Sequence, residues 1–211
     1  MGNKWDDPQY MEARWETLCE MAQACRDCGL HEGVTQKVVG DPPQWTGPKP
    51  IVFIGEAPGA DEDAEGIPFV GKSGQKLRQH LRSIRLPENL YGIMNTVQCR
   101  PPGNREPEPP EITACSRFFM EKLRMWNPRV IVPLGKPACR LVFGISSFQI
   151  TTNACVERKS NIKHGSFCLR IPAFPMPHPR WGIHNPDVYA GMWEKLDVWL
   201  ASQGIANRAE E

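Results

Sequence analysis

The chain lacks three features that would point to a membrane or to a general affinity for polyanions. No apolar run approaches the roughly eighteen residues that a membrane-spanning helix needs, and the opening stretch, MGNKWDDPQY, contains no apolar secretory signal. Charge of one sign is not in excess, because 25 Lys and Arg face 24 Asp and Glu for a net charge of +1. We therefore expect a cytoplasmic globular protein with no membrane partner, whose basic surfaces are local.

Linkers and internal repeats are also lacking, whereas proline and cysteine are abundant. We expect one domain over residues 1–211, with a frayed tail at 203–211, and a monomer. The 21 prolines cluster at 42–50, 101–110 and 172–179, so much of the functional chain should lie in stiff loops. Eight cysteines are many for a reducing compartment, where a disulfide framework does not persist. A metal or a cluster is the better first interpretation.

Strand and helix signals alternate along the chain. Short continuous apolar runs predict buried strands at 50–55, 93–97, 129–135 and 166–174. Apolar residues three and four apart predict a helix at 10–24, and a helix-start signature predicts one at 71–85. A short helix is expected after Pro137, and apolar spacing predicts further helices at 111–126 and 186–202. Ser73 is the expected N-cap of the second helix, and Val188 is expected on the apolar stripe of the last. This order is typical of an α/β fold, here a three-layer α/β/α sandwich with a mainly parallel central sheet, whose ligand lies at the carboxyl ends of the strands.

Four cysteines have a spacing that could deliver their thiolates to one site. Cys25 and Cys28 follow the first predicted helix, and Cys99 and Cys115 bracket the rigid loop RPPGNREPEPP. Most single cysteines are buried structural thiols, and four thiolates also suit tetrahedral zinc. Since metal identity follows only weakly from sequence, spacing alone leaves a cluster, zinc and no metal about equally open.

An acidic segment, GEAPGADEDAEGIPFVGKSGQKL, follows the first predicted strand. Its acidic residues are Glu56, Asp61, Glu62, Asp63 and Glu65. Such a run is usually a solvated surface, but the six Pro and Gly residues between positions 58 and 74 require a fixed, tightly turned backbone. A defined acidic loop at a strand end predicts a site that activates water.

Several segments together carry a resemblance to a known family. They are CRDC at 25–28, EAPGADEDAEGIPFVGKSGQKL at 56–77, NTVQCRPPGNREP at 95–107 with Cys115, LGKPA at 134–138 and HP at 178–179. In this order they resemble the family 4 uracil-DNA glycosylases of the uracil-DNA glycosylase superfamily, over about residues 20 to 200. The resemblance implies a monofunctional hydrolase that removes uracil flipped out of DNA and leaves an abasic site. It also implies a [4Fe-4S] cluster on Cys25, Cys28, Cys99 and Cys115.

The resemblance implies which residues recognise the base. A base inside a duplex must be extruded into a pocket and read on its hydrogen-bonding edge. Phe69 would stack on the flipped pyrimidine, and Asn95 would bond its O4 and N3 edge. His178 would donate to O2, where negative charge develops as the glycosidic bond breaks. Glu62 matches the position that lies against C5 of the base, where bulk would reject thymine.

The water that meets the sugar cation needs a carboxylate or a backbone carbonyl beside it. Glu56 is the first candidate for orienting this water, and Ala57 would contribute its backbone. Asp61 and Asp63 are second choices.

Contacts with the DNA backbone need local positive charge. Segments 71–86 and 158–186 carry basic residues and no acid. Lys72 and Ser73, at a helix start, form the expected phosphate site. After the His-Pro pair the family usually has Ser and then an apolar wedge, whereas this chain has Arg180 and Trp181. We expect Arg180 to hold a phosphate or enter the minor groove, and Trp181 to fill the opened stack.

Two other functions remain open at this point. The altered segment after His178 allows a glycosylase of the same fold that excises another modified pyrimidine, such as a hypermodified base of phage DNA. A cluster-bearing DNA-binding or redox module without catalysis is the other. The joint presence of Glu56, Phe69, Asn95 and His178 argues against that module. The cysteines outside the matched motifs, Cys139, Cys155 and Cys168, are not expected to bind the cluster.

Overall fold

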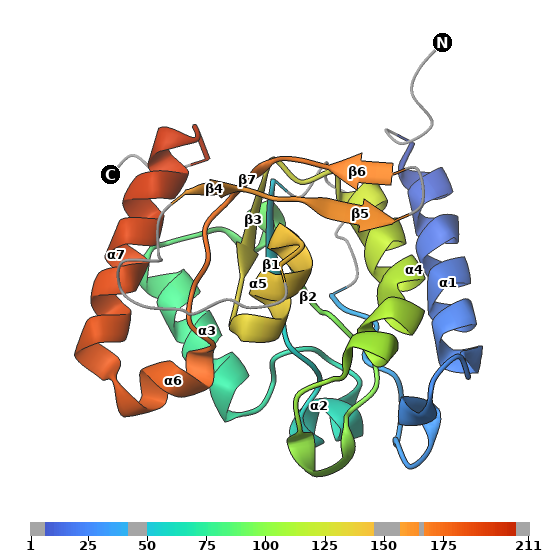
Figure 1. The fold of residues 1–211 in the computed structure, drawn as a ribbon. Coiled ribbons are helices and arrows are strands. Elements are labelled where there is room, and N and C mark those ends of the chain that lie inside the picture. The colour runs from blue at the N-terminus through green and yellow to red at the C-terminus, as the bar shows by residue number, and fades with distance from the viewer. Residues whose placement is uncertain (1–6, 42–49, 146–156, 165–166, 206–211) are drawn as a thin grey trace.

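A five-stranded sheet forms the centre of the molecule (Figure 1). The structure is a computed structural model that describes residues 7–41, 50–145, 157–164 and 167–205. The sheet has the order β2-β1-β3-β7-β4. Its strands are β1 (Ile51–Gly55), β2 (Tyr91–Asn95), β3 (Val130–Pro133), β7 (Pro172–Ala173) and β4 (Arg158–Lys159). Only β4 among these runs antiparallel to its neighbour, and β5 (Ile162–His164) pairs with β6 (Phe167–Leu169) in a separate ribbon.

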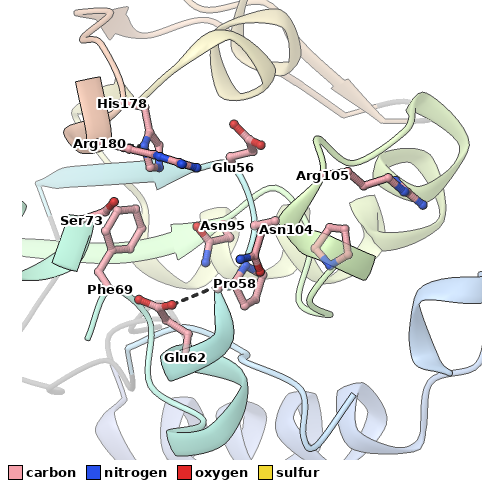
Figure 2. Close-up of a pocket in the computed structure, with 13 residues that line it drawn as sticks. Glu56, Pro58, Glu62, Phe69, Ser73, Asn95, Asn104, Arg105, His178 and Arg180 are labelled. Carbon is pink, nitrogen blue, oxygen red and sulfur yellow. Dashed lines mark hydrogen bonds between the residues drawn. The ribbon is translucent and has the colours of Figure 1, made fainter. Parts of the chain in front are cut away.

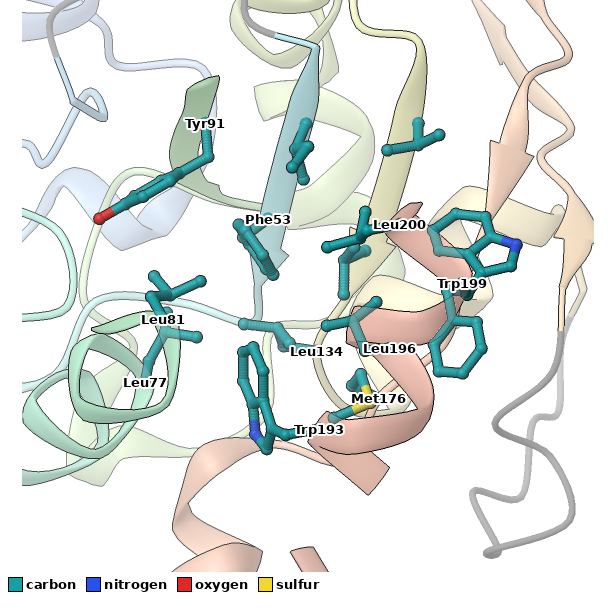
Figure 3. Close-up of a cluster of buried hydrophobic side chains, with 14 of the residues drawn as sticks. Phe53, Leu77, Leu81, Tyr91, Leu134, Met176, Trp193, Leu196, Trp199 and Leu200 are labelled. Atoms are coloured by element: carbon teal, nitrogen blue, oxygen red, sulfur yellow. The ribbon is translucent and has the colours of Figure 1, made fainter. Parts of the chain in front are cut away.

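Helices cover both faces of the sheet, which explains why its central strands are apolar without alternation. One face carries α3 (Lys72–Ser83), α6 (Pro179–His184) and α7 (Pro186–Ser202), and the other carries α4 (Pro109–Trp126) and α5 (Lys136–Phe143), with α1 (Pro8–Ala24) packed outside α4. Successive side chains of β1 point to opposite faces: Phe53 packs among the residues of α3 and α7 (Figure 3), and Ile54 packs against α4 and α5. The expected three-layer sandwich is confirmed.

The central strands end at the same level, so the loops that follow them meet. Gly55 pairs with Asn95, and Ile54 pairs with Pro133. The loop after β1 contains α2 (Ala60–Glu65), and the loop after β2 contains the 3-10 turn η4 (Pro102–Asn104). Two further 3-10 turns are η2 (Gly29–His31) and η3 (Glu88–Leu90). Parallel α/β sheets bind ligands at this edge.

Several sequence-based expectations are corrected. The strand expected at 166–174 is divided, because its first part pairs with β5 and only Pro172–Ala173 joins the main sheet. Helix α3 has Gly71 and not Ser73 as its N-cap, because the Glu62 carboxylate accepts the Gly71 N–H. Val188 is 46% exposed, and Tyr189 takes its place in the core.

Within the described residues, no helix is long and apolar enough to cross a bilayer.

Candidate active site

A cavity of about 200 Å³ lies at the carboxyl ends of β1 and β2 (Figure 2). It is lined by Glu56, Ala57, Pro58, Gly59, Glu62, Phe69, Ser73, Asn95, Pro101, Asn104, Arg105, His178 and Arg180. The cavity therefore brings together most of the expected site residues from four separate stretches of chain. Asp61, Asp63, Lys72 and Trp181 are not among the residues that line it.

Gly55 allows two side chains to lie directly over the end of β1. A Cβ atom added at Gly55 would stand 2.3 Å from Asn95 Oδ1 and 2.4 Å from the Phe69 ring. Any larger residue would push both side chains away. Asn95 is 4% exposed, and among the described residues its Oδ1 has no hydrogen-bond partner. A buried acceptor without a partner is costly, so the site is suited to a ligand that donates a hydrogen bond there.

The backbone holds Phe69 in an unusual conformation. Its φ is 56°, in the left-handed region, which costs a non-glycine residue roughly 1 kcal/mol or more. The Arg78 guanidinium donates to the carbonyl oxygens of Phe69 (3.4 Å) and Pro68 (3.3 Å). The Phe69 backbone also packs closely against α3 at Gly74, where a Cβ atom would stand 1.9 Å from the Phe69 carbonyl oxygen. Interactions outside the cavity thus fix the ring, whose centroid lies 6.4 Å from that of His178.

Glu62 connects the starts of two helices. Its carboxylate accepts the backbone N–H of Gly59 at 3.0 Å and of Gly71 at 2.9 Å, so both oxygens have partners (Figure 2). The negative charge also faces the positive N-terminal end of α3. The sequence pattern did not reveal this role. Moving the Glu62 carboxylate would break both hydrogen bonds, so this wall of the cavity is fixed.

His178 is held as a neutral ring. The Arg180 backbone N–H donates to His178 Nδ1 at 3.3 Å, which leaves the ring proton on Nε2. Burial, and to a smaller extent the Arg180 cation, lowers the pKa of His178 to about 4. Gly135 at the end of β3 has a φ of 91°, and a Cβ there would stand 3.1 Å from His178 Cβ. The imidazole is therefore a neutral hydrogen-bond donor at neutral pH.

Glu56 places a carboxylate on the same side of the cavity as His178 and Arg180 (Figure 2). Its backbone oxygen accepts the Thr96 hydroxyl at 2.5 Å, which fixes the turn after β1. Burial raises the pKa of Glu56, Glu106 raises it further, and Arg140 and Arg180 oppose the change. Within the described chain, no hydrogen bond occupies the Glu56 carboxylate, so it is available to bind water.

Four expected site residues lie elsewhere. Both Asp63 oxygens accept the Thr35 backbone N–H at 3.1 Å, so this buried carboxylate anchors the N-terminal segment. Asp63 was expected in the cavity but does not line it. Asp61 on α2 and Lys72 on α3 are both exposed, and neither lines the cavity. Trp181 is 39% exposed and packs edge-on against Tyr189, at a centroid distance of 6.3 Å.

The wall opposite Phe69 comes from residues that the sequence analysis did not single out. Pro101, Asn104 and Arg105 belong to the proline-rich loop after β2. Arg105 donates to both oxygens of Glu111, at 2.6 and 2.9 Å, so its guanidinium is already paired. The signal available in the sequence was the stretch NREP between two clusters of proline.

A second, smaller cavity of about 20 Å³ collects four cysteines. Cys25, Cys28, Cys99 and Cys115 all line it, and all are free thiols. Burial, with a smaller contribution from neighbouring thiols, raises the pKa of Cys99 to about 12. Burial likewise raises the pKa of Cys115 to about 11. Buried thiols of this kind ionise only when a strong positive charge, such as a metal, binds them.

The four cysteines offer ligands of the kind that an iron–sulfur cluster uses. Within the part of the chain that the structure describes, no three His, Cys, Asp or Glu side chains are close enough to hold a single metal ion. An iron–sulfur cluster binds each thiolate through a different iron, so its ligands stand farther apart. Arg117 donates to Cys25 Sγ at 3.6 Å, as donors around cluster thiolates do.

The remaining cysteines lie away from this cavity. Cys139 is buried on α5, with its Sγ 3.9 Å from the Pro133 carbonyl oxygen. Cys168 is exposed on β6. Cys155 is outside the described residues, so its expected exclusion from the ligand set stays a prediction.

Comparisons with known proteins agree with this geometry. The family model described as the uracil DNA glycosylase superfamily matches residues 45–200. A type-4 uracil-DNA glycosylase of Archaeoglobus fulgidus is 40% identical over 165 residues, which cover 78% of this chain and 81% of that protein. One from Sulfurisphaera tokodaii is 36% identical over 176 residues, covering 82% and 77%. One from Thermotoga maritima is 42% identical over 127 residues, covering 60% and 65%.

Proposed function

The chain belongs to the uracil DNA glycosylase superfamily, and we infer from this membership that it hydrolyses the N-glycosidic bond of uracil in DNA. It is a DNA glycosylase, a hydrolase of base-excision repair, and its substrate is DNA. We propose that it acts as a single-domain monomer without a lyase step. The cavity at the ends of β1 and β2 is the proposed active site, and the roles below are proposals for its residues.

Asn95 carries the proposal for base recognition. Uracil presents an N3–H donor next to the O4 acceptor, and a carboxamide offers the complementary acceptor and donor. The buried, unpartnered Asn95 Oδ1 supports this pairing. Phe69 stacks on the pyrimidine from the side of the cavity where its ring is fixed. Cytosine has no N3–H and would place its amino group against the Asn95 donor, so it is rejected.

His178 stabilises the leaving base. Negative charge develops on O2 of uracil as the bond to the sugar breaks, and a donor already aimed there lowers the barrier. The Nε2–H of the neutral ring supplies this donor, since Nδ1 is occupied by the Arg180 N–H. No proton transfer from the ring is needed, which agrees with the low pKa of His178.

Glu56 orients the attacking water and offsets the positive charge on the sugar. Its carboxylate shares the cavity with His178, and the neighbouring Ala57 backbone lines the same wall. Asp61 and Asp63 are not needed for this step, because neither lines the cavity. A water molecule that donates a hydrogen bond to the Glu56 carboxylate attacks C1′ of the deoxyribose. The products are free uracil and an abasic site.

The DNA backbone is bound around the mouth of the cavity. Ser73 lines the cavity at the start of α3, and Lys72 is exposed beside it. Arg180 extends over the cavity, where its guanidinium would hold a phosphate next to the flipped nucleotide (Figure 2). Trp181, exposed on α6, would fill the space that the flipped nucleotide leaves.

The four cysteines would hold a [4Fe-4S] cluster. The fit rests on four free thiols around one small cavity, two of which ionise only beside a positive charge. Through Cys25 and Cys28 after α1, Cys99 after β2 and Cys115 on α4, these residues would tie three segments of the chain to one bound cluster.

A glycosylase for a C5-decorated pyrimidine is the competing proposal, and Glu62 distinguishes the two. If the Glu62 carboxylate lies against C5, it excludes a substituent there, because its two backbone hydrogen bonds prevent it from turning away. The test is release of free base from oligonucleotides that carry uracil, thymine, cytosine or 5-hydroxymethyluracil. We expect release of uracil alone. Release of the decorated base with no release of uracil would contradict the proposal.

A further inference from the structure

Lys122 is a buried cation that uracil excision does not use. It lies on α4 with 1% of its surface exposed. Its Nζ donates to the Val39 carbonyl oxygen, and within the described residues no carboxylate forms an ion pair with it. Lysine is almost never fully buried unless a negative group compensates its charge. With its cysteines as thiols, the described part of the chain therefore offers Lys122 no partner of opposite charge.

The groups near Lys122 that can become negative are cysteines. Lys122 follows Cys115 by seven residues, so the two share a helix face, and helical side chains lean toward the N-terminus, which brings the ammonium toward Cys115. Burial lowers the pKa of Lys122 to about 8, whereas Cys115 and then Cys19 act to raise it.

Hydrogen bonds connect the Lys122 ammonium, through the backbone of Val39 and Val38, to a residue that lines the cysteine cavity. The carbonyl that binds Lys122 Nζ belongs to Val39, and the preceding Val38 donates its N–H to the Gln98 carbonyl oxygen at 2.9 Å. Gln98 lines the cavity together with Cys99 and Cys115, and the Gln98 backbone N–H donates to the Cys115 sulfur. The buried Lys122 ammonium is thus held against a segment that is bonded to the cavity wall, where water does not reach it.

We propose that Lys122 is the internal counter-cation of the four-cysteine site and that its charge keeps the bound cluster from being oxidised. The proposal rests on the cluster proposed above. Four thiolates give a [4Fe-4S] centre a net negative charge, which becomes smaller on one-electron oxidation. A fixed positive charge nearby stabilises the more negative, reduced form, and it acts strongly because water does not screen it.

Lys37 provides a matched control on the outer side of the same cavity. It lines the cavity, and its charge lowers the pKa of Cys99. Its Nζ donates to the Gln23 carbonyl oxygen at 2.7 Å in an exposed position, so solvent and salt screen the charge. Lys37→Met and Lys122→Met remove the same charge from the screened and the unscreened side.

The experiment uses the full-length protein purified without oxygen. Iron and acid-labile sulfide are counted per chain, and the one-electron oxidation of the cluster is titrated optically with ferricyanide. In Lys122→Met we expect the equilibrium to shift at least about tenfold toward the oxidised cluster, which is ~59 mV for one electron. Lys37→Met should shift it much less, and Lys122→Arg, which keeps the charge, should resemble the wild type.

Four results would overturn the proposal. The first is a wild-type potential in Lys122→Met, which would reduce Lys122 to a tether for the Val39 carbonyl. The second is a shift in Lys37→Met as large as that in Lys122→Met. If Lys122→Met retains no iron, the iron content of Lys122→Arg decides. Full iron content in Lys122→Arg supports the proposal, and a loss of iron as complete as in Lys122→Met refutes it. Wild-type protein without iron and sulfide would refute the cluster itself, and this failure is visible before any substitution.

Discussion

The base cavity and the cysteine cavity lie at the same edge of the sheet, yet they are completed in different ways. In the base cavity backbone amides fix two polar side chains, Glu62 through two N–H groups and His178 Nδ1 through a third, whereas Asn95 Oδ1 has no partner among the described residues. In the cysteine cavity two thiols have strongly raised pKa values, and outside its lining the buried Lys122 lacks a carboxylate partner among the described residues. The first cavity is preorganised by hydrogen bonds, and the second is the proposed site of a cluster that would draw its thiols into the ionised form.

The largest expected effect breaks the cysteine cavity alone. Cys99→Ala should remove the cluster, since three thiolates leave one iron without a protein ligand, and iron per chain should fall to the background. Cys139→Ala is the matched control, because Cys139 is also buried but lies on α5 and does not line the cavity. Visible absorbance and metal analysis measure both. Full iron content in Cys99→Ala, or its loss in Cys139→Ala, would contradict the ligand assignment.

The next effect breaks the base cavity alone. His178→Ala removes the donor to O2, and loss of one such donor typically reduces kcat by about 10²–10³. Single-turnover release of uracil measures the effect, and iron content should stay at the wild-type value. His184→Ala, an exposed histidine at the end of the same helix, should retain activity. Equal rates for the two variants would remove His178 from the mechanism.

Acid should sharpen the contrast, because the base cavity depends on a neutral histidine. The folded-state pKa of His178 is about 4, below its ordinary value of 6.5, so the unfolded chain binds this proton more readily. The stability that neutral His178 contributes is therefore fully present above pH 6.5 and is lost as the pH falls toward 4. Urea unfolding at pH 7, 6 and 5 should show a steeper decline for wild type than for His178→Gln. Parallel declines would argue against a buried neutral ring.

The smallest effect separates DNA opening from base recognition. Trp181→Ala should slow uracil release from duplex DNA several-fold and from single strands much less, because an unpaired strand has little stacking to disrupt. Ile183→Ala, another exposed apolar residue of α6, is the control. A loss that is equal in both substrates would assign Trp181 to the base cavity.

Long apolar and periodic segments made the main layers predictable from the sequence. The strands β1 and β3 and the helices α1, α4 and α7 lie where the patterns predicted them. Helices α2 and α6 were not predicted, because six residues are too few to show a helical period. The strand at 166–174 was mispredicted because local sequence does not show which half pairs with β5 and which joins the sheet.

The candidate site was predictable in its residue types but not in all their roles. Motif resemblance indicated Phe69, Asn95 and His178, which line one cavity. Asp63 stands in the same acidic run as Glu62, yet its partner is Thr35, 28 residues away in sequence, so its anchoring role depends on the fold. Lys122 looked like an ordinary polar position of an amphipathic helix, and only its burial distinguishes it.

The most direct test of the base cavity asks whether the Asn95 carboxamide reads the edge of the flipped base. The measurement is base release by the Asn95→Asp variant. The carboxylate would keep the acceptor for N3–H but would replace the amide donor that faces O4. We predict that single-turnover release of uracil falls sharply and that release of cytosine, whose amino group can donate to the new acceptor, becomes detectable. Unchanged uracil release with no cytosine release would contradict the proposal that Asn95 reads the edge of the flipped base.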